Sequence, residues 1–199
     1  MALLKSDPYG AFEPVLEGDG VVLRLPRPSD YPAWSMVRAE SRAFLTPWEP
    51  SWARDELSRP AWRRRLKAYQ AEVKAGEGYP FFLFRNVDGA LIGGVRLSNI
   101  RRGVQQCCSV GYWMGERFAC QGYMTAGVRA VVPFVFDELG LHRLEAACLP
   151  HNEASKRVLE RVGFRREGLA RQYLRINGQW QDHVLYGLVR GDPASGVRV

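Results

Sequence analysis

Short apolar runs separated by turn residues predict most of the secondary structure of this 199-residue chain. Apolar runs bounded by Gly, Pro, Asn or Asp are typical of β-strands. We expect seven strands, at residues 21–25, 81–84, 91–97, 107–114, 142–148, 165–174 and 179–188. Asp88-Gly89 and Asn177-Gly178 each stand between two of these runs, and both dipeptides predict hairpins.

Helical spacing of apolar residues predicts four helices, over residues 29–42, 59–74, 122–139 and about 152–163. Ser58 and Asn152 stand where helix N-caps are expected, and Ser29 or Asp30 can serve the first helix. Pro133 falls inside the third helix. Because proline lacks a backbone N–H, it predicts a kink there.

The order of these elements predicts an α/β fold of the α+β type. An antiparallel hairpin region comes first, two parallel strands follow, and another hairpin ends the domain. A mixed, mostly antiparallel, seven-stranded sheet with about four helices on its faces accommodates this order. Residues 20–190 are expected to form the domain, with residues 1–19 as a loosely held arm and residues 191–199 as a frayed tail.

The segment from Ser109 to Phe164 carries the strongest candidate for a ligand site. It predicts a strand, a short loop, a helix, a second strand and a second helix, so its two strands are expected to be parallel neighbours. Gly122 stands at the start of the first helix, where free N–H groups and the helix dipole favour a phosphate. Taken alone, a glycine at this position is more often a simple turn.

Composition excludes other classes of protein. Apolar residues make up 46% of the chain and charged residues 25%, as in ordinary globular proteins. The sequence has no apolar run of about 18 residues and no secretory signal, so we expect a cytoplasmic protein without a membrane contact. The four cysteines and three histidines show no zinc-ligand spacing, so no metal site is expected.

The net charge of +7 favours an acidic partner, although a solvated basic surface explains it at least as well. Arg63-Arg64-Arg65-Leu66-Lys67 is the densest basic run, and it falls on a predicted amphipathic helix. Charge alone therefore does not choose between a nucleic acid, a phosphorylated ligand and no partner at all.

Two signatures carry a resemblance to a known family. The first is Pro150-His151-Asn152-Glu153-Ala154-Ser155, with Leu159 and Gly163-Phe164 at fixed spacings. The second runs from Tyr173 through Asn177-Gly178-Gln179-Trp180 to Asp182-His183. Together they resemble the GNAT family of N-acetyltransferases, in particular its ribosomal-protein alanine N-acetyltransferase branch. The resemblance covers roughly residues 21–188 and implies the GNAT fold, with acetyl-CoA as co-substrate.

The resemblance assigns the cofactor site to two groups of residues, which are Trp113, Met114, Gln121, Gly122, Tyr123, Met124, Thr125 and Ala126, and then Asn152, Ser155 and Lys156. The phosphate loop departs from the family pattern, because Ala119 replaces its first Gln or Arg and Met124 replaces its last Gly or Ala. The cradle works through backbone N–H groups, so we expect acetyl-CoA binding to survive. Lys156 is better explained, from its position alone, as part of a solvated helix face.

By the same resemblance, Asn152 hydrogen-bonds the pantetheine arm or the acyl region, and Ser155 protonates the leaving thiolate. A proton donor assists the departure of a thiol whose pKa is about 8.5. Taken alone, both residues are explained as a helix N-cap and a first-turn residue. The acceptor groove is assigned to Trp48, Glu49, Tyr173, Trp180 and Asp182, each of which also suits an ordinary structural role.

The family's usual general base is a Glu on the central strand, and this chain has Ser109 there. At pH 7 roughly one α-amine in ten is uncharged, against fewer than one lysine in a thousand. The absence of a strong base therefore favours an α-amine acceptor. Glu49 and Asp182 are the remaining candidates for the base.

The sequence thus predicts an acetyl-CoA-dependent enzyme that acetylates the N-terminal α-amine of a protein by direct attack on the thioester. A ribosomal protein that begins with Ala or Ser is the expected acceptor, and the basic surface would then contact CoA phosphates or ribosomal RNA. Two alternatives stay open. One is an acetyltransferase for small-molecule amines, and the other is a non-catalytic factor that binds the ribosome.

Overall fold

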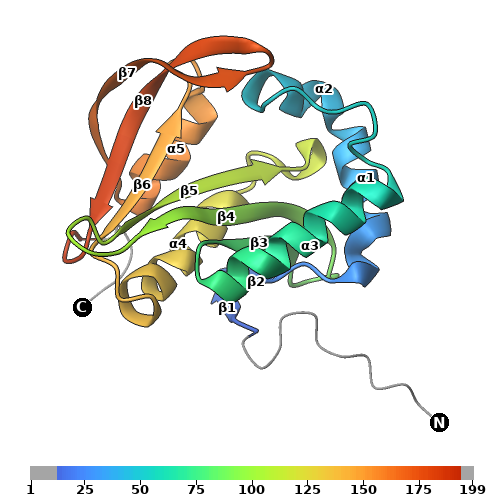
Figure 1. Ribbon diagram of the computed structural model, residues 1–199, viewed down its shortest axis with the longest axis horizontal. Coiled ribbons are helices and arrows are strands. Elements are labelled where there is room, and N and C mark those ends of the chain that lie inside the picture. The colour runs from blue at the N-terminus through green and yellow to red at the C-terminus, as the bar shows by residue number, and fades with distance from the viewer. Residues whose placement is uncertain (1–12, 194–199) are drawn as a thin grey trace.

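The computed structural model describes residues 13–193, which form one eight-stranded sheet in the order β1-β2-β3-β4-β5-β6-β8-β7 (Figure 1). The strands are β1 (Val15–Gly18), β2 (Val21–Arg24), β3 (Tyr79–Arg85), β4 (Leu91–Arg101), β5 (Cys107–Met114), β6 (Arg143–Cys148), β7 (Arg165–Ile176) and β8 (Gln179–Val189). All neighbours in this sheet are antiparallel except β5 and β6, which are parallel. The mixed, mostly antiparallel sheet is the one that the sequence predicts.

Strand β1 accounts for the difference between the seven expected strands and the eight observed. Residues 15–18 belong to the segment expected to be a loosely held arm, and that expectation is wrong for them. They pair with β2, with Leu16 opposite Leu23, and the Leu16 side chain is buried in the core. A four-residue strand is too short to show a period of two in the sequence. Residues 1–12 of the arm and residues 194–199 of the tail lie outside the described part.

The helices form two layers around the sheet. They are α1 (Tyr31–Glu40), α2 (Arg42–Leu45), α3 (Arg59–Ala75), α4 (Tyr123–Pro133) and α5 (Glu153–Val162), together with the 3-10 turns η1 (Pro28–Asp30), η2 (Thr46–Trp48) and η3 (Glu116–Phe118). Helices α1 and α3 cover one face, and α4 and α5 cover the other (Figure 1). Within residues 13–193, no helix is both long and apolar enough to cross a bilayer.

Alternation along β3 divides the core between the two faces. Phe81 packs edge-on against Phe134 on the α4 side, with ring centroids 5.5 Å apart. Its neighbour Phe82 points the other way and stacks on Trp62 of α3 at 5.9 Å. Successive side chains of a strand leave opposite faces of the sheet, so one apolar run supplies both layers.

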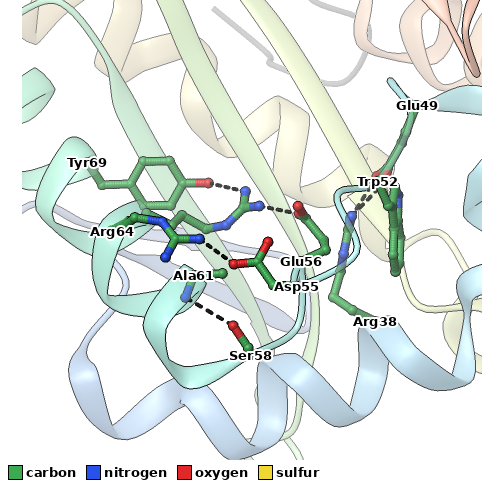
Figure 2. Close-up of polar contacts among 10 residues, drawn as sticks. Arg38, Glu49, Trp52, Asp55, Glu56, Ser58, Ala61, Arg64 and Tyr69 are labelled. Atoms are coloured by element: carbon green, nitrogen blue, oxygen red, sulfur yellow. Dashed lines mark hydrogen bonds and ion pairs between the residues drawn. The ribbon is translucent and has the colours of Figure 1, made fainter.

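The loop before α3 is fixed by polar contacts (Figure 2). The Ser58 hydroxyl accepts a hydrogen bond from the Ala61 N–H at 3.2 Å and caps the helix, as predicted. Arg64 pairs with Asp55 across the same turn, and Arg65 pairs with Glu56. Two arginines of the densest basic run are therefore engaged by carboxylates of the chain itself.

Pro133 ends α4, and a π-helical turn (Phe134–Glu138) follows. In that turn the Leu139 N–H donates to the Phe134 carbonyl five residues back. Proline cannot donate to the carbonyl four residues before it, so the ladder changes register at this point. The disruption predicted from the sequence takes this form.

Candidate active site

The cavity of this protein lies where two parallel strands separate. Strands β5 and β6 pair only from Cys107 to Ser109, opposite Arg143 to Glu145. Beyond these pairs the strands diverge around a cavity of about 650 Å³, lined by residues 110–114 of β5 and residues 146–149. We call this space the wedge cavity. Its position matches the splayed central strand that the family resemblance implies.

The first end of the wedge cavity is closed by the loop that leads into α4. Gly122 is the N-cap residue with φ of 87°, and Cys120 also has positive φ, at 59°. The cap makes no side-chain hydrogen bond to the first N–H groups of α4. A Cβ at Gly122 would meet no atom within 4 Å, so the space above the loop is open. Uncapped N–H groups beside an open space fit a pyrophosphate.

A basic depression adjoins this loop and shares Gly122, Thr125, Arg157 and Arg161 with the wedge cavity. Arginines 129, 157 and 161 line it, together with Asp19 and Glu160. Lys156, which the resemblance assigned to the cofactor, is instead 2.7 Å from Glu153 in an ion pair and lies outside the lining of both spaces. The positive charge beside the loop therefore comes from arginines on α4 and α5.

Asn152 and Ser155 meet at the start of α5, and both line the wedge cavity. The Asn152 Oδ1 accepts a hydrogen bond from the Ser155 N–H at 3.0 Å, which is the N-cap contact expected from the sequence. The cap fixes the first turn of α5. It therefore also fixes where the Ser155 hydroxyl lies in the cavity.

Tyr112 of β5 reaches across to Ser155, and the sequence analysis did not single it out. Its hydroxyl lies 2.8 Å from the Ser155 Oγ and 3.3 Å from the Ser155 carbonyl oxygen. Burial raises the pKa of the Tyr112 phenol well above its usual range, so the phenol stays protonated at neutral pH. Burial also raises the pKa of the Cys148 thiol, and a hydrogen bond with Ser155 partly opposes that rise. Neutral proton donors thus surround the Ser155 hydroxyl.

The second end of the wedge cavity is aromatic and apolar. Trp48 and Glu49 line it from the loop after α2, and Leu174, Ile176 and His183 line it from the β7–β8 hairpin. The Trp48 ring packs against His151 with centroids 5.5 Å apart. The hairpin tip is tied to this loop, because the Asn177 N–H donates to the Glu49 carbonyl at 2.9 Å.

The Glu49 carboxylate is held by a buried arginine (Figure 2). Each of its oxygens lies 2.7 Å from a different Arg38 nitrogen, and the Trp52 indole N–H donates to Oε2 at 2.9 Å. The Arg38 guanidinium also lies over the rings of Trp52 and Trp113, at 4.4 and 5.0 Å from their centroids. A bidentate pair of this kind holds the carboxylate in one orientation.

Most residues assigned from the sequence therefore meet in one cavity. Those that line it are Trp48, Glu49, Trp113, Met114, Gln121, Gly122, Tyr123, Met124, Thr125, Asn152 and Ser155. Ala126 lines the adjoining basic depression instead. Tyr173 and Trp180 lie outside this lining and are 48% and 62% exposed. Asp182 also lies outside it, and its Oδ1 accepts a hydrogen bond from the Gln172 N–H at 2.9 Å.

Comparison with known proteins decides the family. The acetyltransferase (GNAT) domain matches residues 21–165 of this chain. The chain belongs to the GNAT family. Its predicted family, fold class and enzyme class are confirmed, and it is an N-acetyltransferase. A GNAT acetyltransferase takes its acetyl group from acetyl-CoA, so the predicted co-substrate is confirmed as well.

Several relatives of this GNAT protein are similar over most of its length. The probable N-acetyltransferase YjcK of Bacillus subtilis is 38% identical over 156 residues, covering 78% of this chain and 86% of the relative. The ribosomal protein uS5-alanine N-acetyltransferase of Escherichia coli is 36% identical over 183 residues, covering 91% and 93%. The solved structure of Mycobacterium smegmatis RimJ in complex with CoA-disulfide is 30% identical, with a TM-score of 0.84 and coverage of 92% and 90%.

Three features of the GNAT site lay beyond the sequence analysis. Tyr112 and His183 stand on strands where alternation alone makes them ordinary core residues. Arg38 reads as one charge on an amphipathic helix, yet it is only 7% exposed. A buried arginine needs an acidic partner, and Glu49, 11 residues later in the chain, is the residue that could have indicated the burial of Arg38.

Proposed function

We propose that this acetyltransferase modifies the N-terminal α-amine of a protein, and that a ribosomal protein is the acceptor. The observation that carries the proposal is the hydrogen bonding of Glu49, which is the only carboxylate among the described residues that line the wedge cavity. Both of its oxygens accept hydrogen bonds from Arg38, so neither is free to take a proton from an amine. A lysine acceptor needs a strong base, whereas an α-amine with a pKa of about 7.7–8.0 does not.

The relatives support the same class of acceptor. The Escherichia coli relative is named for alanine acetylation of ribosomal protein uS5, and it aligns with 91% of this chain. The structure from Vibrio fischeri, a ribosomal-protein-S5-alanine acetyltransferase, is 31% identical with a TM-score of 0.83. Contact with ribosomal RNA stays a prediction from the basic surface. The pairing of Arg64 and Arg65 with carboxylates reduces the positive charge that this surface offers to RNA.

In the proposed reaction the chain's own groups bind, orient and move protons. The loop at Gly122 holds the pyrophosphate, and the wedge cavity holds the pantetheine arm with its thioester beside Ser155. The amine nitrogen bonds to the thioester carbon as the carbon–sulfur bond breaks. Ser155 gives its proton to the sulfur, and the Tyr112 hydroxyl, 2.8 Å away, orients the Ser155 hydroxyl. The nitrogen then loses a proton, which restores Ser155. A backbone N–H of the splayed strand near Met114 would bind the carbonyl oxygen.

A peptide series tests the acceptor. Peptides of ribosomal-protein sequence that begin with Ala or Ser are incubated with acetyl-CoA, and thiol release and peptide mass are followed. We expect one acetyl group, located on the α-nitrogen. The matched control is the same peptide with a blocked N-terminus and one internal lysine, which should not react. Turnover of the blocked peptide, or of small-molecule amines alone, would contradict the proposal and favour the other acceptor class.

A further inference from the structure

His183 of β8 has no role in the reaction as described so far, although it lines the wedge cavity. It is 2% exposed. Its neighbour Val184 pairs with Cys148, and Tyr186 of the same strand donates a hydrogen bond to Glu160 of α5. Because successive side chains alternate, His183 points to the opposite face of the sheet, away from α5. This is the face on which α1 lies, and Trp48 and Glu49 line the same cavity.

One hydrogen bond determines which nitrogen of the His183 ring is basic. The Nδ1 atom lies 2.9 Å from the Gln181 carbonyl oxygen. A carbonyl oxygen can only accept, so Nδ1 carries the hydrogen. In the neutral ring, Nε2 then keeps its lone pair. Within residues 13–193, no hydrogen bond of the chain engages Nε2.

The ring is also held from a second side. Tyr173 packs edge-on against it, with centroids 5.8 Å apart and planes at 70°. Tyr173 sits in a bulge of β7, where the register with β8 shifts between Ala170 and Leu174 and Gln172 has φ of 46°. The Asp182 carboxylate accepts the Gln172 N–H and so fixes this bulge. Two residues assigned to the acceptor groove from the sequence therefore position His183 from outside the cavity.

The other groups around the cavity do not include one that can take a proton from the acceptor amine. An α-amine in water is mostly charged at neutral pH and must lose a proton before it can attack. Glu49 is engaged by Arg38, and Ser109 stands at the closed end of the strand pair, opposite Glu145. Among the described residues that line the wedge cavity, His183 alone offers an imidazole nitrogen.

We propose that His183 is the catalytic proton acceptor for the acceptor amine, an inference that rests on the proposed function. The Nε2 atom takes one proton from the α-ammonium group and leaves a neutral amine. The amine nitrogen bonds to the thioester carbon while the carbon–sulfur bond breaks, and Ser155 gives the sulfur a proton. The nitrogen then loses a second proton, which restores Ser155, and keeps one hydrogen as the amide. The proton on His183 passes to solvent.

The test compares glutamine variants of two of the three histidines. In His183→Gln the side-chain amide can still donate to the Gln181 carbonyl, but it is not a base. We expect kcat/KM for an Ala-initiated peptide to fall by about 100-fold or more. The affinity for acetyl-CoA, measured by calorimetry, and the Tm should stay at the wild-type values. His142 is exposed at the distant end of β6, and His142→Gln is the matched control with unchanged activity.

A second variant keeps the proposal falsifiable if His183→Gln folds poorly. In His183→Ala the ring is removed, and added imidazole should restore part of the activity because it supplies a base to the vacated space. Wild-type kcat/KM in His183→Gln, or the absence of rescue in a folded His183→Ala, would overturn the assignment. A wild-type enzyme that acetylates only small-molecule amines would overturn the α-amine proposal instead. The same variants assayed with those amines would then decide the role of His183.

Discussion

The hydroxyl of Tyr112 lies 2.8 Å from the Ser155 Oγ and joins the splayed central strand to the first turn of α5. This contact spans the wedge cavity at the position where the family resemblance places the leaving sulfur. Both hydroxyls are neutral, and burial keeps the phenol protonated. The phenol can therefore hold the Ser155 hydroxyl in place without itself carrying a buried charge.

Removing either hydroxyl should slow the reaction. We expect Ser155→Ala to lower kcat by about 100-fold or more, because the leaving thiolate loses its proton donor. Tyr112→Phe should lower kcat by about tenfold, because Ser155 loses the hydrogen bond that orients it. The affinity for acetyl-CoA should change little in both variants. In the double variant the two losses should not add, since Tyr112 acts through the Ser155 hydroxyl. Full additivity would show that the hydroxyls act separately.

The conformation of Gly122 should be essential for cofactor binding. An alanine there must adopt φ of 87°, which costs about 1–2 kcal/mol and favours a rearranged loop. We expect Gly122→Ala to weaken acetyl-CoA binding by about tenfold in a calorimetric titration. Gly168→Ala is the control, because its Cβ would meet no atom within 4 Å and its φ is not positive. Wild-type affinity in Gly122→Ala would mean that the loop does not hold the pyrophosphate.

Replacing Arg38 alone should lower the free energy of unfolding more than replacing Arg38 and Glu49 together. Arg38→Met leaves the Glu49 carboxylate partly buried without its partner, and breaking a buried pair costs about 3–5 kcal/mol. We expect a loss near the lower end of that range, measured by urea denaturation, because the Glu49 side chain keeps 19% exposure. The double variant Arg38→Met with Glu49→Leu should recover much of it. A double variant that is less stable than Arg38→Met alone would contradict this account.

Stability should fall in alkaline solution because of buried thiols. Burial raises the pKa of Cys108 to about 12, from an ordinary value of 9.0. Above pH 9 the unfolded chain therefore loses this proton while the folded chain keeps it, and the free energy of unfolding decreases. At pH 10 this effect amounts to about 1 kcal/mol. Denaturation of the wild type and of Cys108→Ala between pH 7.5 and 10 measures it. Equal pH slopes in the two proteins would contradict it.

Local signals in the sequence predicted much of this fold. Asn177 and Gly178 have φ of 44° and 81°, the positive values that an Asn-Gly hairpin requires. Gly122 and Asn152 stand at helix starts, where their residue types are favoured. Each of these signals depends on a few neighbouring residues, so it survives without knowledge of the rest of the chain.

The missed features depend on which segments meet in space. Tyr112 gains its role from Ser155, 43 residues later in the chain. His183 gains its role from the Gln181 carbonyl, the bulge at Gln172 and the separation of β5 from β6. Trp180 is exposed on the hairpin, and sequence alone could not decide which face it occupies. Its assignment to the acceptor groove stays a prediction.

The short pairing of β5 with β6 has a mechanical consequence. Three residue pairs join the five strands β1 to β5 to the three strands β6, β8 and β7, and contacts between α4 and α5 reinforce this seam. The sheet therefore consists of two parts that are hydrogen-bonded to each other along only part of β5 and β6. Acetyl-CoA bound between the diverging strands would contact the unpaired parts of both β5 and β6. Its binding should therefore restrict motion between the two parts of the sheet and not only within the cavity. Amide hydrogen exchange in residues 110–114 should slow the most when acetyl-CoA binds.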